Sequence, residues 1–358
     1  MIANENFSLS YIKQISKKYK IDHQMMQKSI HALKLVEHLA NSGADFIFKG
    51  GTSLMLLTKN PKRLSTDVDI LVKPGFDIES YIKEIQEKYP FQFYEEDIRQ
   101  TDSKIVKRHF KLYYDPNDYS EEACEILLDV LYEENHYSSV IQKEVTTKFI
   151  KQDGNPAAIV KVPSPNSIIG DKLTAFAPNT TGVQYTFINK KGEPVDKKTE
   201  VAKQFYDVAC LYDCIDDFAQ VFDTYNAIAK NEIEYRQIKD GTPEICLIDT
   251  IKCCLAYLLN KSELTNNYSF LLEGLQRLKN FIYGKKPDSK ELILMFSKVL
   301  LLSSCILTNT DLFKLNMKNY SLNEKFVEFK KFEIINKEAY NNLVFASNLL
   351  DPFLEKII

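Results

Sequence analysis

The sequence lacks the features of a membrane or secreted protein. Its most apolar stretch, residues 292–307, is too short to span a bilayer and contains Lys298, Ser303 and Ser304. We therefore expect this stretch to form a buried helix. Residues 1–10 are polar and no apolar run follows the first lysines, which argues against a signal peptide. These absences predict a cytoplasmic protein.

Cysteine pairs, histidine clusters and an excess of basic residues are also missing. The seven cysteines are odd in number and include no CxxC pair, so neither a disulfide framework nor a zinc knuckle is indicated, and reduced thiols are expected. The five histidines show no metal-ligand spacing, and we assign none of them to catalysis. A formal net charge of -3 excludes a global basic surface, so nucleic-acid binding would need local patches.

What is present indicates two domains. A chain of 358 residues with 44% hydrophobic residues can bury two ordinary cores. Short apolar runs typical of strands dominate the first half, and helical spacing dominates from residue 216 onward. The predicted strands cover residues 44–48, 67–72, 91–94, 106–114 and 126–132, after a helix over 10–41. The predicted fold class is α+β (α/β), with a mixed-sheet domain over residues 1–165 and a mostly helical C-terminal domain over 166–358.

The strongest chemical signal is in residues 48–72, which read FKGGTSLMLLTKNPKRLSTDVDILV. A strand that ends at Lys49 runs into Gly50 and Gly51, whose small size permits a tight turn and the close approach of a ligand to the backbone. Ser53 then opens a helix, and the N–H groups at a helix start can bind phosphate. The segment thus predicts a phosphate-binding turn.

Two aspartates follow this turn on a predicted strand. Asp67 and Asp69 alternate along the strand, so their side chains point to one side with their Cα atoms about 7 Å apart. Hard Mg²⁺ prefers carboxylate oxygens, and two such ions about 4 Å apart stabilise the attacking and leaving oxygens in nucleotidyl transfer. Asp129 is the candidate third acid, because it interrupts the apolar strand ILLDVLY, which could pair beside DVDILV.

Each of these elements has a simpler explanation when it is taken alone. A lone DxD is more often a solvated strand end or a turn, a lone Gly-Gly pair is usually a turn, and Asp129 could be a strand-edge aspartate that meets a lysine. Their order is more specific: a strand, Gly-Gly-Thr-Ser, a helix, a Ser-x-Asp-x-Asp strand and a later strand with an aspartate. The order favours a metal site for nucleotide transfer.

This segment resembles the opening motif of the AbiEii-type nucleotidyltransferase toxins of type IV toxin-antitoxin and abortive-infection systems. In that family a Gly-Gly-(Thr/Ala)-(Ser/Ala)-Leu turn precedes Arg-x-Ser-x-Asp-x-Asp-(Leu/Ile). The matching residues here are Gly50, Gly51, Thr52, Ser53, Leu54, Arg63, Ser65, Asp67, Asp69 and Ile70. Two later helical motifs, Asp-Lys-Leu-x-Ala and Lys/Arg-x-x-Tyr-Asp-(Leu/Val), are met by Asp171, Lys172, Leu173 and Ala175 and by Lys203, Tyr206, Asp207 and Val208. The resemblance covers about residues 29–212, and a lysine-rich insert over 180–199, predicted to be a loop or hairpin, departs from it.

The resemblance implies a polymerase-β-like nucleotidyltransferase domain whose cleft the helical domain completes. The predicted metal ligands are Asp67, Asp69 and Asp129, which are predicted to be catalytic together with Lys172 and Asp207. The implied nucleotide-binding residues are Lys49, Gly50, Gly51, Thr52, Ser53, Arg63, Ser65 and Lys172. Lys172 would place an ammonium group near the triphosphate and offset charge on the leaving pyrophosphate. Asp207 would take part in catalysis or hold the lysine in place, and a helix-surface ion pair with Lys203 is the alternative. For Asp171 a structural or capping role is expected.

The predicted reaction is attack of an acceptor hydroxyl on the α-phosphate of a nucleoside triphosphate bound with Mg²⁺ or Mn²⁺, with release of pyrophosphate. The residues leave the acceptor open between the 3′ end of tRNA, a protein hydroxyl and a small molecule such as an aminoglycoside. The family favours the tRNA end and implies a cognate antitoxin encoded nearby. The alternative from another class is a catalytically dead module that binds nucleotide or antitoxin, although such proteins usually lose a metal carboxylate.

Local basic residues would suit an RNA acceptor. They are Lys59, Lys62 and Arg63 before the DxD strand, Arg99, Lys104, Lys107, Arg108 and Lys111 after it, and Lys190, Lys191, Lys197 and Lys198 in the insert. If the fold gathers them around the cleft, they form a groove for a phosphate backbone. An ordinary solvated surface is the alternative, which charge counts alone leave open.

Overall fold

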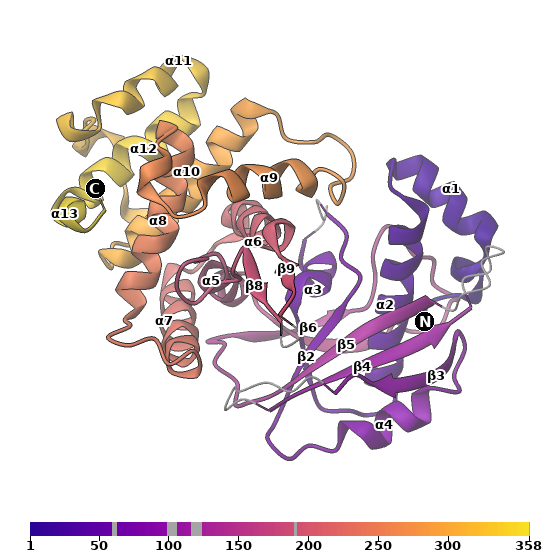
Figure 1. Ribbon diagram of the computed structural model, residues 1–358. Coiled ribbons are helices and arrows are strands. Elements are labelled where there is room, and N and C mark those ends of the chain that lie inside the picture. The colour runs from indigo at the N-terminus through magenta and orange to yellow at the C-terminus, as the bar shows by residue number, and fades with distance from the viewer. Residues whose placement is uncertain (59–62, 99–105, 116–123, 190–191, 358) are drawn as a thin grey trace. The chain divides into compact units, whose positions relative to one another are not determined.

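Two units make up the chain in the computed structural model, which describes residues 1–58, 63–98, 106–115, 124–189 and 192–357 (Figure 1). The first, here named the sheet unit, consists of Met1–Asn135, Ser139–Ser164 and Phe281–Lys285. The second, the helical unit, consists of His136–Ser138, Pro165–Asn280 and Lys286–Ile358. The segment at Phe281 joins the sheet unit through its backbone, since the Leu64 amide donates to the Phe281 carbonyl at 3.3 Å.

One mixed sheet forms the frame of the sheet unit. Within the described residues its strands lie in the order β3-β4-β5-β2-β1-β7-β6. The strands are β1 (Ile47–Lys49), β2 (Val68–Val72), β3 (Phe91–Glu96), β4 (Val106–Tyr114), β5 (Cys124–Tyr132), β6 (Val140–Glu144) and β7 (Ile159–Pro163). β2 pairs with β5, and β1 with β7, in parallel, while the other neighbours are antiparallel. This mixed sheet confirms the predicted α+β class.

Alternation along the strands gives the sheet one core face. β2 buries Val68 and Ile70, and β5 buries Leu128 and Val130, because alternate side chains of a strand point to one side. The helices of the sheet unit are α1 (Leu9–Tyr19), α2 (His23–Asn41), α3 (Gly50–Leu57) and α4 (Ile78–Ile85). The buried strand residues join apolar side chains of these helices in one core, with α2 against the strands (Figure 1). The intervening strand residues point to the opposite side, here named the second face.

The predicted strands that bear the chemistry are confirmed, with differences at their ends. β4 has the predicted bounds, whereas β1 begins three residues later than expected and β2 one residue later. β6 and β7 were not predicted, because their sequences, VIQKE and IVKVP, mix apolar with charged residues or end in proline. The helix predicted over residues 10–41 is two helices, since Asp22 caps α2 by accepting a hydrogen bond from the Met25 amide at 3.0 Å.

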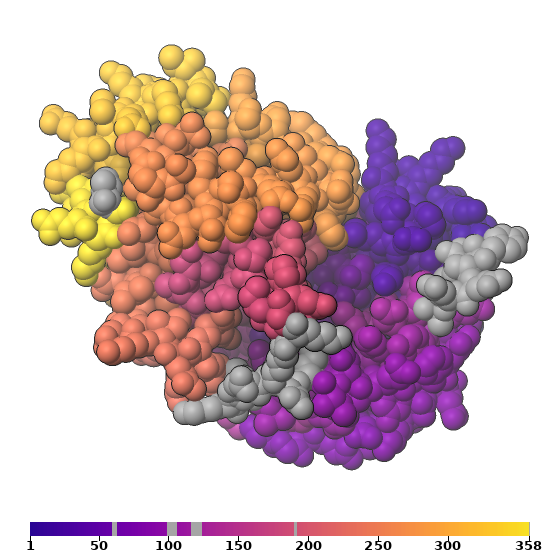
Figure 2. Space-filling model, viewed as in Figure 1, coloured from indigo at the N-terminus to yellow at the C-terminus, as the bar shows by residue number. Residues whose placement is uncertain are grey.

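Helices fill the helical unit. They are α5 (Pro165–Ala175), α6 (Lys198–Leu211), α7 (Phe218–Tyr235), α8 (Pro243–Leu259), α9 (Tyr268–Leu278), α10 (Ser289–Leu307), α11 (Phe332–Ile335), α12 (Lys337–Leu349) and α13 (Leu354–Ile357). The insert between α5 and α6 contains the predicted hairpin, whose strands β8 (Thr186–Ile188) and β9 (Pro194–Asp196) lie on the surface (Figure 2). α10 covers the most apolar stretch and is largely buried, as expected. Of the helices formed by described residues, none is long and apolar enough to cross a membrane.

Candidate active site

Four ionisable side chains form a row across the second face of the sheet. Lys49 ends β1 and is the register partner of Asp69 on β2. Asp69 is the partner of Asp129 on β5, and Asp129 is in turn the partner of His109 on β4. Neighbouring strands lie about 4.8 Å apart, so each side chain of the row can reach the next. Strand pairing therefore brings together two carboxylates that are far apart in the sequence.

The burial of neighbouring residues explains why the row faces away from the core. Val68 and Ile70, on either side of Asp69, are fully buried, so the aspartate between them points to the second face. The same alternation holds around Asp129 on β5, whose side chain is 36% exposed. The predicted pairing of ILLDVLY with DVDILV is confirmed, in parallel register.

A cavity of about 200 Å³, here named the carboxylate cavity, lies at this row. Its lining residues are Lys49, Asp69, Ile70, Lys107, His109, Asp129, Val130 and Leu131. Two lysines and one histidine thus accompany the two carboxylates. Carboxylate oxygens suit a hard divalent cation, and lysine ammonium groups suit phosphate, so the cavity has the chemistry to bind a metal and a phosphorylated ligand together.

The Gly-Gly turn has a steric reason at each position. Gly50 has a φ of +73°, and a Cβ there would overlap the carboxylate of Asp69. A Cβ on Gly51 would lie 2.8 Å from Nη2 of Arg63 and 2.8 Å from Oγ of Ser65. The two glycines therefore let the turn pack directly against the residues of the Arg-x-Ser-x-Asp-x-Asp motif.

The hydroxyl groups that follow the turn hold it in place. Thr52 and Ser53 are fully buried. Thr52 Oγ1 donates to the Asp67 carbonyl at 2.5 Å, and Ser53 Oγ donates to the Gly50 carbonyl at 2.9 Å. α3 begins at Gly50, three residues before the predicted start, so both hydroxyls lie inside the helix. The Thr52 hydroxyl thus ties α3 to the segment that leads into β2, and the Ser53 hydroxyl stabilises the first turn of α3.

Asp67 lies just before β2, and the prediction of a strand over residues 67–72 is wrong at this residue. Its carbonyl accepts a hydrogen bond from the Thr52 hydroxyl of α3, and Thr66 Oγ1 donates a hydrogen bond to Asp67 Oδ1 at 3.2 Å. The Asp67 side chain is exposed and does not line the carboxylate cavity. Its role as a metal ligand stays a prediction.

The paired carboxylates have the chemistry to hold a divalent cation. In the part of the chain that the structure describes, no three His, Cys, Asp or Glu side chains converge on a common metal position. Mg²⁺ is commonly bound through one or two carboxylates, with substrate phosphates and water filling its remaining positions. Asp69 and Asp129, on adjacent strands of one face, match that mode of binding.

His109 is a site residue that the sequence analysis missed. Its Nδ1 lies 2.6 Å from Oδ1 of Asp129, and the imidazole lines the carboxylate cavity. A carboxylate oxygen accepts hydrogen bonds, so Nδ1 is the donor. No spacing along the chain signals this contact, because it is made across the antiparallel pair of β4 and β5.

The two later motifs meet within the helical unit. Lys172 on α5 lies 3.3 Å, Nζ to Oδ2, from Asp207 on α6, and its ammonium also donates to Gln204 Oε1 at 3.1 Å. The Asp207 side chain is 2% exposed, so it is a buried residue and not one on the helix surface. Asp171 accepts a hydrogen bond from the Tyr137 hydroxyl at 2.6 Å, in keeping with the structural role expected for it.

Only part of the expected basic groove can be placed. The residues Lys59, Lys62, Arg99, Lys104, Lys190 and Lys191 lie outside the described residues. Lys107 lines the carboxylate cavity. Arg108 points to the core side of β4, where its guanidinium pairs with Glu79 and Glu96 at 2.7 Å each and lies over the Phe110 ring. These two acids hold Arg108 away from the row on the second face.

The mixed sheet, the paired carboxylates and the Gly-Gly turn are together the features of a nucleotidyltransferase. A family model described as "Nucleotidyl transferase AbiEii toxin, Type IV TA system" matches residues 34–280, which is more than half of the chain. The chain belongs to this family of nucleotidyltransferase toxins. The match confirms the family that the motifs predicted.

Two solved structures are similar to this chain at low sequence identity. The nucleotidyltransferase toxin MenT4 of Mycobacterium tuberculosis H37Rv has 12% identity and a TM-score of 0.45, over 89% of this chain and 93% of that chain. An antigenic nucleotidyltransferase-like protein of Paracoccidioides brasiliensis has 13% identity and a TM-score of 0.36, over 60% of this chain and 90% of that chain. No curated protein matches the chain. The family assignment therefore rests on the family model.

Proposed function

We propose that the protein transfers a nucleotide from a nucleoside triphosphate to an acceptor hydroxyl in a metal-dependent reaction. The observation that carries this proposal is the pair of Asp69 and Asp129, held on adjacent strands in the carboxylate cavity. Two neighbouring carboxylates repel each other unless a cation offsets their charge. A divalent cation that binds with the triphosphate would offset this repulsion together with the neighbouring lysines.

Each group around the cavity has a role in this proposal. Asp69 and Asp129 hold Mg²⁺ or Mn²⁺, with Asp67 contributing from the segment before β2. When bound, the metal supplies positive charge at the reacting phosphate. The Gly50 turn and the first amides of α3 bind the phosphates, and Lys49 adds a second positive charge beside them. The turn itself is supported by Arg63, Ser65, Thr52 and Ser53, which therefore affect phosphate binding indirectly.

His109 is proposed to position Asp129. Its Nδ1–H occupies Oδ1 of the carboxylate, so Oδ2 is the oxygen directed to the metal or to the proton of the acceptor hydroxyl. Holding a ligand in one orientation through such a partner commonly affects activity by about 10–100-fold. His109 therefore acts on the reaction through Asp129 and not on the nucleotide itself.

Lys172 is proposed to offset the charge that develops on the leaving pyrophosphate, with Asp207 as its support. Both side chains are nearly fully buried in the helical unit, so Asp207 fixes the direction of the lysine ammonium. A preoriented ammonium stabilises developing negative charge without reorganising during the reaction.

The proposed acceptor is the 3′ end of tRNA, in the cytoplasm, with growth arrest on expression and a cognate antitoxin as the partner that prevents it. The resemblance of the motifs to the toxin family favours this choice, and Lys107 beside the row suits a phosphate backbone. Contacts of lysine with phosphate release counterions, so RNA binding should weaken steeply as salt rises.

Incubation with total RNA or total protein, each with Mg²⁺ and one labelled nucleoside triphosphate, separates the acceptors. We expect label at the 3′ end of tRNA and release of pyrophosphate, both abolished by a chelator. Transfer RNA whose terminal ribose has been oxidised with periodate is the matched control, because it has lost the acceptor hydroxyl. Label in protein alone would rule out the tRNA acceptor, and the absence of pyrophosphate with every acceptor would favour the catalytically dead binding module.

A further inference from the structure

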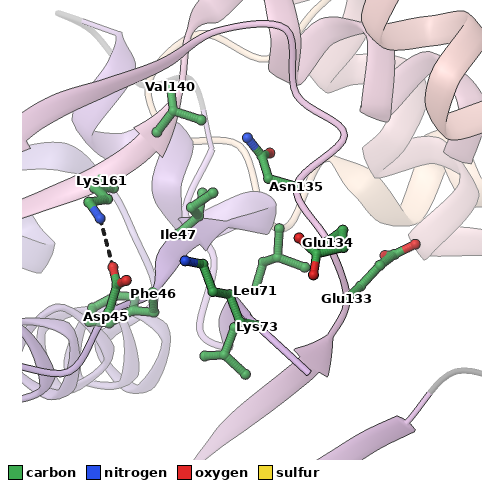
Figure 3. Close-up of a pocket in the computed structure, with 11 residues that line it drawn as sticks. Asp45, Phe46, Ile47, Leu71, Lys73, Glu133, Glu134, Asn135, Val140 and Lys161 are labelled. Carbon is green, nitrogen blue, oxygen red and sulfur yellow. Dashed lines mark hydrogen bonds and ion pairs between the residues drawn. The ribbon is translucent and has the colours of Figure 1, made fainter. Parts of the chain in front are cut away.

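A second cavity, of about 270 Å³, lies on the second face of the sheet unit beyond the row. Its lining residues are Asp45, Phe46, Ile47, Leu71, Val72, Lys73, Glu133, Glu134, Asn135, Val140 and Lys161 (Figure 3). It shares no lining residue with the carboxylate cavity. Leu71 is two residues beyond Asp69 on β2, and Ile47 is two residues before Lys49 on β1. The cavity therefore lies about 7 Å further along the same strands.

The lining combines an apolar floor with polar groups at its rim. Ile47, Leu71 and Val140 supply apolar surface from three different strands. Lys73 and Glu134 add an ammonium and a carboxylate, and Figure 3 shows the Glu134 carboxylate turned toward Leu71. Apolar surface with a few hydrogen-bonding groups is the chemistry that receives a heterocyclic base.

A small ion pair closes one side of this cavity. Lys161 on β7 lies 2.7 Å, Nζ to Oδ1, from Asp45, and both side chains are about half exposed. The two charges offset each other, so this wall attracts neither anions nor cations strongly. The whole lining has three acidic side chains, Asp45, Glu133 and Glu134, against the two lysines Lys73 and Lys161, so it disfavours a phosphate.

The direction of the strands indicates which part of a nucleotide reaches this cavity. β1 runs from the second cavity at Ile47 to the Gly50 turn, where α3 begins. The phosphates belong at the turn, and the reacting α-phosphate belongs at Asp69 and Asp129. The second cavity lies on the far side of the paired carboxylates from the turn, so a nucleotide that extends along β1 and β2 places its base there.

We infer that the second cavity binds the base of the incoming nucleoside triphosphate, an inference that rests on the proposed function. The cavity is accordingly named the base cavity. Glu134 sets its preference, because a carboxylate accepts hydrogen bonds and donates none. A base with an amino group at its edge satisfies Glu134, whereas the carbonyl of uracil at the corresponding position repels it.

CTP and UTP make the sharpest test, because cytosine carries an amino group where uracil carries a carbonyl. Binding of each to the full chain is measured by calorimetry in Mg²⁺ without acceptor, beside ribose 5′-triphosphate, which has no base. We expect CTP to bind about tenfold more tightly than UTP, the effect of one hydrogen bond to a charged group. Glu134→Gln should bring this ratio close to one, because an amide both donates and accepts.

Glu144→Gln is the matched control, since Glu144 is an exposed glutamate on β6 that does not line the base cavity. It should keep the wild-type ratio of CTP to UTP affinity. Ribose 5′-triphosphate should bind equally to all three proteins, because it does not reach Glu134. A ratio that Glu134→Gln leaves unchanged would overturn the base cavity while the proposed function stands. Failure of every triphosphate to bind, ribose 5′-triphosphate included, would overturn the proposed function and this inference with it.

Discussion

Replacing Gly50 with alanine tests how the turn and the Asp69 carboxylate depend on each other. Gly50 has a φ of +73°, and an L-residue in the left-handed region costs about 1–2 kcal/mol. Alanine also lowers the entropy of the unfolded chain, which offsets about 0.4–1 kcal/mol of that cost. The backbone alone therefore predicts that Gly50→Ala lowers the free energy of unfolding by about 1 kcal/mol.

The Asp69 side chain adds a second cost at this position. A Cβ on Gly50 would overlap the carboxylate of Asp69, so the carboxylate must leave its place. Overpacking of this kind costs about 1–3 kcal/mol, which brings the expected loss to about 2–4 kcal/mol. The displaced carboxylate should also lower nucleotide transfer on the order of 10²-fold, because misplacement of a catalytic group by about 1 Å has that effect.

Gly43→Ala is the matched control for backbone strain. Gly43 has a φ of +83°, and a Cβ there would meet nothing within 4 Å. This variant should lose about 1 kcal/mol of stability and retain wild-type transfer. Urea unfolding followed by circular dichroism measures the stability of both variants, and incorporation of labelled nucleotide measures their activity. Equal losses of stability and activity in the two variants would refute the packing of Asp69 against the turn.

His109, Lys172 and His31 give three further tests. His109→Ala should lower kcat about tenfold or more with little change in KM for the triphosphate. His109→Asn, whose amide can still donate to Asp129, should restore part of the lost kcat. Equal kcat in wild type and both variants would refute the positioning role. Lys172→Ala should slow nucleotide transfer, and Lys172→Arg, which keeps the charge but not the compact ammonium geometry, should restore only part of the rate. Unchanged rates in both variants would show that Lys172 has a structural role. Burial lowers the pKa of His31 from 6.5 to about 4. Between these two pH values the imidazole is protonated in the unfolded chain and neutral in the native protein. The free energy of unfolding should therefore fall by about 3 kcal/mol as the pH drops from above 6.5 to about 4. Unfolding curves of His31→Leu should lack this part of the pH dependence.

Local patterns predicted the strands that carry the site. β4 has the expected bounds because its apolar residues alternate with polar ones, and β5 differs only by its first two residues. Asp129 was recognisable as an acid inside an apolar strand, and register places it beside Asp69. Alternation determines which face of the sheet a side chain points to. The sequence therefore predicts that Asp69 and Asp129 lie on the same face.

Contacts between elements could not be predicted in the same way. His109 meets Asp129 because β4 and β5 pair at that register, which no spacing along the chain encodes. Asp207 meets Lys172 on another helix, although Lys203 lies one turn away on its own helix. β6 and β7 pair with each other and β7 pairs with β1, contacts that their short mixed sequences do not indicate. Such contacts depend on tertiary packing. A single sequence indicates them only where the residues belong to a known motif.

Magnesium-dependent pyrophosphate release by wild type, Asp69→Asn and Asp129→Asn tests the central claim most directly. Both variants keep the size of the side chain, and Asp240→Asn, at an exposed loop residue in the helical unit, is the matched control. With nucleoside triphosphate and tRNA, wild type and Asp240→Asn should release pyrophosphate at similar rates. The two site variants should be slower on the order of 10²-fold or more, with unchanged circular dichroism. Wild-type rates in a folded Asp69→Asn or Asp129→Asn protein would contradict the assignment of the paired carboxylates as the reaction centre.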